Sequence, residues 1–409
     1  MHGFVCGPWP HPGRVSFVRL VREDAAPAEP AAEPDSIENE FSRVRSGDRG
    51  FKIEDRRTDT EFELYFEDDG DRGDEYNFDP VAGAAPICEP VTVSQPHIDR
   101  SPPRQRMRIN LEYRIPCAID ANRHQRQAET ERLQIELIAT LYAGLDRIDF
   151  DARVANRARD HRLRVALKTP IVATKALHDT SFGVVERPLA SSEPEGTEDI
   201  CPAGPHRTWS AVEGSSVAAA ILSRGLYEVE VRAEREGATT LLLTLLRCVG
   251  WLSRSDLATR RGGAGPELET PAAQELGAHH FEFAVALYRG SYLDAAIVQR
   301  AAAYSYPPRV FAAKTPPGDE LSLARCDNPR IAFSTARLTA RARYRVRAYS
   351  ASSKPERAHF TFGAGAKARI VNLAGRNVTR KGVRRTRRGS LELELRPFEI
   401  VTFEVTPQR

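Results

Sequence analysis

The chain has 409 residues, which is long enough to bury a large core, and two domains are the reasonable count. Its 59 Lys and Arg residues against 56 Asp and Glu residues leave a net charge of +3, which is too small to indicate nucleic acid or an anionic membrane as a partner. A neutral ligand such as a carbohydrate fits this balance. No run of eighteen apolar residues occurs, and residues 1–14 lack the pattern of a signal peptide, so we expect a soluble, cytoplasmic protein.

The six cysteines are scattered along the chain. No two of them have the C-x-x-C spacing that zinc ribbons and redox motifs use. We therefore expect each of them to be a small, unpaired residue in a reducing compartment. They are Cys6, Cys88, Cys117, Cys201, Cys248 and Cys326.

In chain order, residues 23–34 are rich in Pro, Ala and Glu and are expected to form an extended linker. Apolar residues then alternate with more polar ones in 133–141 and in 148–154, and Asp146-Arg147 lies close to the turn between them. This pattern predicts an antiparallel hairpin with one face on a core. Similar strand patterns follow at 161–167, 226–231, 241–249 and 279–287.

Helical periodicity is scarce, although Pro271 to Leu276 could form one turn of helix. Many strands without alternating helices indicate an all-β fold of stacked antiparallel sheets. The composition shifts near Arg330, and the alternation on both sides of Pro397 predicts a small terminal β-sandwich. Its strands are expected at 341–349, 359–362, 369–373 and 391–405.

The most informative stretch is Gly70–Phe78, followed by Asp79-Pro80, because it sets four charged groups around two glycines. Like charges on a short loop repel, and ordering them costs chain entropy, so a compensating group is expected outside the loop. A second specific stretch is Leu245–Leu257. It continues through Arg260, Gly265-Pro266, Thr270-Pro271, Gln274 and Gly277.

Both stretches resemble the C-terminal half of glycoside hydrolase family 38, the retaining α-mannosidases. Other segments occur in the family's order: Ser36–Phe41, Ile53–Thr58, Phe66–Gly70, Arg159–Val165, Asp179–Pro188 and Ala219–Leu226. The resemblance implies a large antiparallel supersandwich of the galactose mutarotase type over residues 37–330 and a small β-domain over 331–409. Val15–Val21 resembles the strand that precedes this region, so residues 1–36 are expected to be a remnant strand and a linker.

The same resemblance implies that the family's catalytic carboxylates and zinc ligands lie on an α/β barrel outside this chain. We therefore expect no catalytic residue, no metal ligand and no cofactor here, with zinc belonging to the full-length family. Asp71, Asp74 and Glu75 could in principle supply an acid/base pair. Adjacent Asp74 and Glu75 point different ways in an extended loop, however, which does not give the opposed geometry that the reaction needs. Whether the chain is itself an enzyme stays open.

Substrate contacts are expected instead from two loops. The resemblance suggests that the first reaches towards the barrel, where Tyr76 helps to close the sugar site and Arg72 pairs with the loop carboxylates. In the second, residues 260–266, glycines let the backbone approach a ligand and arginine N–H groups suit vicinal hydroxyls. The alternatives are an Arg72–Asp74 pair that only staples a sandwich corner, and a solvated surface loop. The predicted substrate-binding residues are Arg72, Asp74, Glu75, Tyr76, Asn77, Arg260 and Arg261.

Other polar motifs favour structural interpretations. His97-Ile98-Asp99 has the spacing of a metal motif but lacks the flanking sequence, so we interpret it as accidental. His279-His280 opens a strand, and its rings are expected to face opposite ways. His161 is expected to hydrogen-bond within its sheet, and Trp251 to belong to the core. The basic tract 380–388 is interpreted as a solvated hairpin, with contact to a polyanion as the weaker alternative.

These features predict the C-terminal β-sandwich portion of an α-mannosidase-like glycoside hydrolase, with a structural and carbohydrate-contacting role and an α-mannoside or another carbohydrate as ligand. One alternative is a non-catalytic subunit that completes a separately encoded catalytic barrel, which would then be its partner. Another is a stand-alone carbohydrate-binding module, for which an aromatic content of 8% with no cluster is little support. Homo-oligomer formation stays open.

Overall fold

The computed structural model describes residues 14–15, 35–189, 198–199, 201–234, 237–307, 321–339, 343–363, 365–385 and 390–407. The chain divides into two compact units. The larger contains Ala28–His178 and Glu186–Gly290, and the smaller contains Met1–Pro27, Asp179–Val185 and Ser291–Arg409. Of residues 1–36, the predicted remnant strand and linker, the structure describes Arg14, Val15, Asp35 and Ser36.

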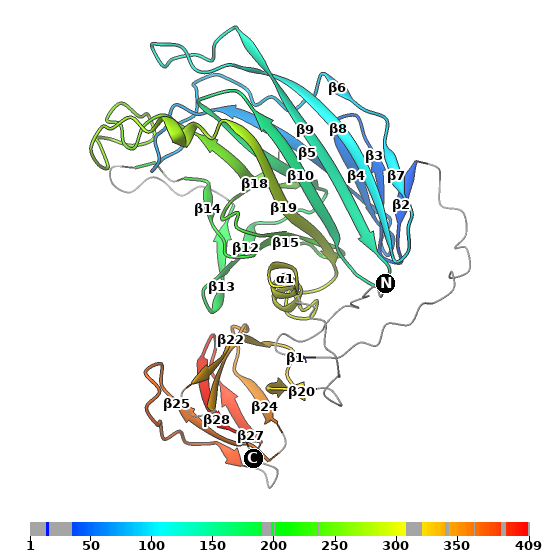
Figure 1. Cartoon of the computed structure of the whole chain (residues 1–409), viewed down its shortest axis with the longest axis vertical. Coiled ribbons are helices and arrows are strands. Elements are labelled where there is room, and N and C mark those ends of the chain that lie inside the picture. The colour runs from blue at the N-terminus through cyan, green and yellow to red at the C-terminus, as the bar shows by residue number, and fades with distance from the viewer. Residues whose placement is uncertain are drawn as a thin grey trace, which may run out of the picture. The chain divides into compact units, whose positions relative to one another are not determined.

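The larger unit is built on an eight-stranded antiparallel sheet and most of a ten-stranded sheet (Figure 1). The first has the order β14-β17-β18-β11-β5-β4-β3-β2. Its strands are β2 (Ser36–Glu38), β3 (Ser42–Ser46), β4 (Gly50–Asp55), β5 (Thr60–Gly70), β11 (His161–Thr169), β14 (Ala203–Pro205), β17 (Glu228–Ala233) and β18 (Thr239–Cys248).

The ten-stranded sheet has the order β13-β12-β15-β16-β19-β10-β9-β8-β6, with β7 also paired to β8. Its strands are β6 (Thr92–Val93), β7 (His97–Asp99), β8 (Arg104–Pro116), β9 (Thr130–Tyr142), β10 (Ile148–Asn156), β12 (Lys175–Thr180), β13 (Gly183–Pro188), β15 (Trp209–Glu213), β16 (Ala218–Ser223) and β19 (Gly277–Tyr288). The predicted hairpin is confirmed, since β9 and β10 pair antiparallel.

The two sheets pack face to face because long strands such as β8, β9 and β10 place apolar residues on one side and more polar residues on the other. In β8, Met107, Ile109 and Leu111 are buried, while Arg108 and Asn110 between them are exposed. The apolar sides of both sheets meet in one large hydrophobic core. The all-β fold predicted from the sequence is therefore confirmed.

The smaller unit holds two four-stranded antiparallel sheets, β21-β24-β27-β26 and β22-β23-β28-β25, and a two-stranded pair, β1-β20. Its strands are β1 (Arg14–Val15), β20 (Leu321–Ser322), β21 (Ala324–Cys326), β22 (Ile331–Thr339), β23 (Arg343–Ser350), β24 (Glu356–Phe362), β25 (Lys367–Val371), β26 (Arg384–Arg385), β27 (Leu391–Leu395) and β28 (Ile400–Thr406). Their apolar sides share a second core. The predicted domain boundary at residue 330 falls between β21 and β22.

Helices are few among the described residues: η1 (Pro271–Gln274), a 3-10 helix within the turn predicted at Pro271–Leu276, and α1 (Ile297–Ser305). Neither has the length and apolarity needed to cross a membrane. Five of the six cysteines lie in the described part of the chain, and all five are free thiols, as predicted.

The aromatic residues at the centre of the large core are expected to contribute to the stability of the fold. Phe150 on β10 stacks on its cross-strand neighbour Phe283, with ring centroids 5.2 Å apart, and its centroid lies 6.1 Å from that of Phe51 in the facing sheet. We expect Phe150→Ala to lower the free energy of unfolding by about 3 to 5 kcal/mol in urea titrations, because it opens a cavity between the sheets. Tyr227→Ala, at a residue that is 61% exposed, is the control and should change it by less than about 0.5 kcal/mol. Equal effects would contradict this account of the core.

Candidate functional site

The register of the eight-stranded sheet brings the two predicted loops to one edge. His161, the first residue of β11, lies opposite both Gly70 at the end of β5 and Cys248 at the end of β18. Because β5 and β18 both run antiparallel to β11, the segments that follow them leave the sheet at the same end. Residues 71–79 and 249–276 are therefore neighbours in space.

The first loop is organised by Asp71, whose side chain is fully buried. Its Oδ1 accepts hydrogen bonds from the backbone N–H groups of Gly73 at 2.8 Å and Asp79 at 3.2 Å, and its Oδ2 accepts one from Arg247 Nε at 2.9 Å. A Cβ on Gly73 would lie 2.0 Å from Asn77 O, so only glycine fits this turn. Arg247 also donates to the carbonyl oxygens of Asp74 and Asn77, which closes the loop around its guanidinium.

Asp74 joins the first loop to the second. Its Oδ1 accepts from the backbone N–H groups of Tyr76 and Asn77, each at 2.9 Å. Its Oδ2 accepts from the backbone N–H of Arg254 at 2.8 Å and from Arg260 Nη2 at 2.5 Å. Burial by itself raises the pKa of Asp74, but the hydrogen bonds from Arg260 and the backbone outweigh it and hold the pKa below its usual range.

Asp79 makes the third link between the loops. Its carboxylate accepts from the backbone N–H groups of Ala258 at 3.1 Å and Thr259 at 3.0 Å, and it pairs with Arg72 Nη2 at 3.1 Å. We call Asp71, Asp74 and Asp79 the carboxylate staple. All three are buried, and every one of them is held by an arginine and by backbone N–H groups.

The structure assigns the predicted arginine partners differently from the sequence analysis. The Arg72–Asp74 pair, which the sequence left as an alternative, does not form: Arg72 pairs with Asp79, and Asp74 pairs with the buried Arg260 of the second loop. The reason is the register of the sheet, which places the second loop within reach of Asp74. A compensating group outside the loop was expected from its charge density, and that expectation is confirmed.

The seven predicted substrate-binding residues fall into two sets. The first set is engaged inside the protein: Arg72, Asp74 and Arg260 form the pairs above, and Asn77 Oδ1 accepts a hydrogen bond from Arg260. The second set is exposed: Glu75, Tyr76 and Arg261. Tyr76 is 56% exposed, and a Cβ on Gly265 would lie 3.4 Å from its hydroxyl, so its side chain extends from the first loop to the second.

Sequence reasoning did not single out Arg247 and Arg254. Arg247 contacts Asp71 from within the apolar strand β18, and Arg254 forms a paired contact with Asp256 and lies 4.7 Å from the centroid of the Trp251 ring. The signal for Arg247 was present as the one charge in an otherwise apolar and threonine-rich strand, Thr239–Cys248. A charge in such a strand needs a partner.

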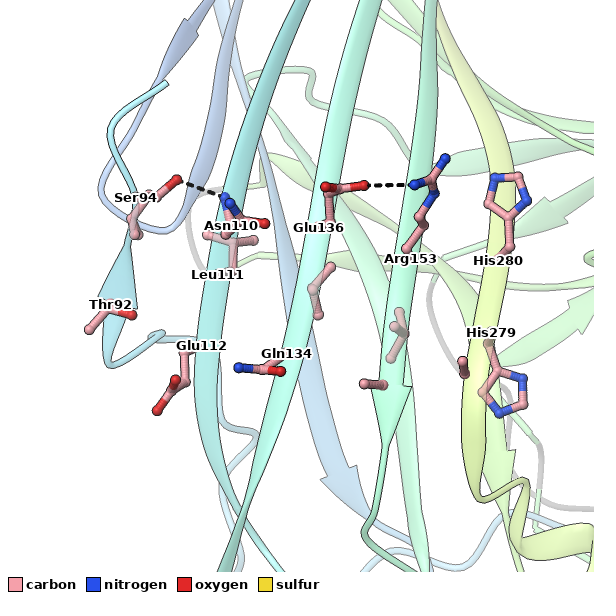
Figure 2. A pocket seen from close by; sticks show the side chains of 15 residues that line it. Thr92, Ser94, Asn110, Leu111, Glu112, Gln134, Glu136, Arg153, His279 and His280 are labelled. Atoms are coloured by element: carbon pink, nitrogen blue, oxygen red, sulfur yellow. Dashed lines mark hydrogen bonds and ion pairs between the residues drawn. The ribbon is translucent and has the colours of Figure 1, made fainter. Parts of the chain in front are cut away.

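The histidines at the start of β19 line a groove of about 630 Å³ on the ten-stranded sheet (Figure 2). His279 Nε2 bonds to Glu275 O at 2.7 Å, and His280 pairs with Asp151 at 2.9 Å, so the two rings have separate partners. Glu136 and Arg153 pair across the groove at 3.1 Å, as Figure 2 shows. None of its described lining residues is Phe, Tyr or Trp. The groove therefore offers a sugar no stacking platform.

His161 hydrogen-bonds within its sheet, as predicted. Its Nδ1 lies 2.6 Å from Asp68 Oδ2, and its Nε2 lies 3.0 Å from Asn156 Oδ1, which itself accepts from Ala158 N. Both ring nitrogens therefore face acceptors, which requires the protonated imidazolium. Burial lowers the pKa of His161, but the charge and hydrogen bond of Asp68 outweigh it and raise the pKa to about 10.

Two other buried histidines share one serine. His178 Nδ1 and His206 Nδ1 each lie 2.8 Å from Ser210 Oγ, and His206 Nε2 donates towards Leu226 O at 3.0 Å. This network suits neutral rings. Burial lowers the pKa of His206 to about 4 and that of His178 to about 3.

The carboxylate staple predicts a large difference between adjacent acidic residues. Asp74→Asn removes the charge that compensates the buried Arg260, so we expect the free energy of unfolding to fall by about 3 to 5 kcal/mol. Glu75→Gln, at the exposed neighbour, should change it by less than about 0.5 kcal/mol. Chemical denaturation of both variants measures the difference, and an Asp74→Asn variant as stable as the wild type would contradict the role of this pair.

The histidine pair predicts acid sensitivity. In the unfolded chain a histidine takes up a proton near pH 6.5, whereas folded His206 does so only near pH 4. The depressed folded pKa means that stability is present above about pH 6.5 and falls as the pH drops towards 4, by on the order of 3 kcal/mol for this residue. We expect the fall to be smaller in His206→Gln than in the wild type, measured by thermal unfolding across this range. The exposed His280→Gln serves as the control, and identical pH profiles for all three proteins would refute the prediction.

Three comparisons show which known proteins this chain is similar to. A curated protein from Halalkalibacterium halodurans, named "Putative mannosylglycerate hydrolase", is 27% identical over 297 residues, which cover 66% of this chain and 30% of that protein. A crystal structure of an α-mannosidase from Enterococcus faecalis V583 superposes with a TM-score of 0.76 at 23% identity, over 94% of this chain and 44% of that chain. A crystal structure of a glycosyl hydrolase family 38 protein from Enterococcus faecalis superposes with a TM-score of 0.75 at 22% identity, over 94% of this chain and 46% of that chain.

The chain thus spans less than half the length of each of these relatives. The two crystal structures support the fold. The family model described as "Glycosyl hydrolases family 38 C-terminal domain" matches residues 37–253, which is more than half of the chain. The resemblance found in the sequence is confirmed, and the chain belongs to the family 38 C-terminal domains.

Proposed function

We propose that this chain is the carbohydrate-contacting, non-catalytic β-sandwich portion of an α-mannoside hydrolase. In this proposal, retaining and zinc-dependent hydrolysis takes place on a barrel region, and the paired loops 71–79 and 249–276 border the sugar site. The observation that carries the proposal is the carboxylate staple. It holds two loops of a family 38 C-terminal domain together and presents a small exposed tip.

The chemistry of the staple suits positioning rather than proton transfer. A general acid for glycoside hydrolysis needs a raised pKa and a second carboxylate about 5 to 5.5 Å away in a retaining enzyme. The pKa of Asp74 is lowered instead, and its two oxygens already accept hydrogen bonds from four groups. Asp74 therefore supports the loops and does not act as the acid.

Among the described residues, no group of three or more His, Cys, Asp and Glu side chains is arranged to hold a metal ion. The triplet His97-Ile98-Asp99, which has the spacing of a metal motif, forms the short strand β7. No step of the proposed function is therefore assigned to a metal held by these residues.

Ligand contact in this proposal falls to the exposed tip formed by Glu75, Tyr76 and Arg261. The carboxylate of Glu75 can accept hydrogen bonds from sugar hydroxyls, and the guanidinium of Arg261 can donate to them. The half-exposed ring of Tyr76 can lie against a sugar face. Backbone N–H of Glu75 donates to Trp251 O at 3.0 Å, so the tip is tied to the second loop.

The proposal is tested by assaying the purified chain with p-nitrophenyl α-mannoside, with and without added zinc. We expect no hydrolysis, because the pKa of Asp74 is lowered and no group of His, Cys, Asp and Glu side chains among the described residues is arranged to hold zinc. A zinc-dependent rate that copurifies with the chain would overturn the proposal.

Calorimetric titration of the same chain with methyl α-mannoside tests the alternative of a stand-alone carbohydrate-binding module. A half-site is expected to bind the sugar too weakly for a calorimetric signal. Saturable binding that is lost in Tyr76→Ala and kept in the exposed control Tyr227→Ala would instead identify a stand-alone carbohydrate-binding module.

A further inference from the structure

The near-neutral net charge of the chain conceals a segregation of charge. Residues 331–409 contain 18 Lys and Arg but only five Asp and Glu, which is a net charge of +13. The whole chain contains 59 Lys and Arg and 56 Asp and Glu. Residues 1–330 therefore contain 41 Lys and Arg and 51 Asp and Glu, which is a net charge of −10. The C-terminal β-sandwich is therefore strongly basic, and the rest of the chain is acidic.

Much of this positive charge lies on one face of a single sheet, β22-β23-β28-β25. The register aligns Arg337, Arg345, Glu404 and Arg369 in one row across the four strands. The alternate residues of these strands, such as Val346 and Phe403, point into the core. We define the arginine face by its six cations: Arg337, Arg343, Arg345, Arg347, Lys367 and Arg369.

Glu404 organises the centre of the arginine face. It is only 5% exposed, and its carboxylate meets Arg343 Nη1 at 3.5 Å, Arg345 Nη2 at 3.1 Å and Arg369 Nε at 3.0 Å. One carboxylate neutralises one of three guanidinium groups, so about two positive charges there have no ion-pair partner among the residues that the structure describes. The hydrogen bond from Arg369 holds the pKa of Glu404 below its usual range, so the carboxylate stays charged.

The remaining cations add to this excess. Arg337 and Lys367 are exposed and make no ion pair to any residue that the structure describes, and Arg337 lies directly opposite Arg345. Like charges opposite one another on a sheet are destabilising, and a bound anion would relieve the repulsion. The row crosses four strands, a span of about 14 Å. Such a span suits several anionic groups on one extended ligand.

We propose that the arginine face binds an acidic polysaccharide. Guanidinium groups form paired hydrogen bonds with carboxylate or sulfate groups, and Thr335, Thr339 and Thr406 beside the arginines can bond sugar hydroxyls. Nucleic acid fits the face less well. Among the described residues of this sheet there is no exposed aromatic side chain for base stacking, and a flat sheet face inserts no element into a groove.

The test titrates the whole chain with polygalacturonate, using neutral mannan and duplex DNA as comparison probes, at low and at moderate ionic strength. The patch variant is the double substitution Arg337→Glu with Lys367→Glu, which reverses two exposed charges and leaves the Glu404 cluster intact. The matched control is Lys354→Glu with Arg357→Glu, an equal charge change at exposed residues outside the face. Circular dichroism confirms that each variant is folded.

We expect the wild type to bind polygalacturonate with an affinity that falls as salt rises, and mannan not to bind. The patch variant should bind about tenfold more weakly, and the control within about twofold of the wild type, because exposed charges act locally. Absence of polygalacturonate binding, or an equal loss in the control, would overturn the proposal. Tighter binding of duplex DNA than of polygalacturonate would overturn it in favour of nucleic acid. Mannoside hydrolysis plays no part in this test, so its outcome is independent of the function proposed above.

Discussion

The geometry of the candidate site depends on three buried carboxylates, each of which is compensated by an arginine and by backbone N–H groups. Removing a carboxylate from water costs several kcal/mol unless charge and hydrogen bonds replace the lost hydration. Asp71, Asp74 and Asp79 meet this condition only when both loops are in place, because backbone N–H groups come from both loops and the arginines come from both loops and from β18. Each partner therefore constrains the others. The result is a rigid corner whose hydrogen-bond partners lie 170 to 186 residues apart in the chain.

This constraint also sorts the residues by what they can do. A side chain whose donors and acceptors are used within the protein cannot exchange them for a ligand without leaving a buried charge unpaired. Asp74 and Arg260 belong to that class, whereas Glu75, Tyr76 and Arg261 remain exposed. A loop with many charged residues can thus act mainly as a support, with only its tip available for recognition.

A comparable arrangement with a different balance of charge occurs in the smaller unit. Glu404, like Asp74, is a buried carboxylate that orients arginines, but it faces three of them instead of one. The Asp74 pair is neutral and closes a loop, while the Glu404 cluster keeps positive charge at the surface. The balance of positive and negative charge at each surface, and not the net charge of +3, decides which ligands that surface can attract.

The sequence by itself determined the features that depend on local pattern. Alternation in 133–141 and 148–154 predicted the β9–β10 hairpin, and the charge density of Gly70–Phe78 indicated a compensating group elsewhere. Only the tertiary structure decided which group that is. Arg260 is 186 residues from Asp74, and the two meet because β5 and β18 both pair with β11. The same holds for the arginine face, whose row forms only once four strands are in register. Periodicity along a strand reports which side a residue faces, but the choice of neighbouring strands and their register are long-range properties of the folded chain.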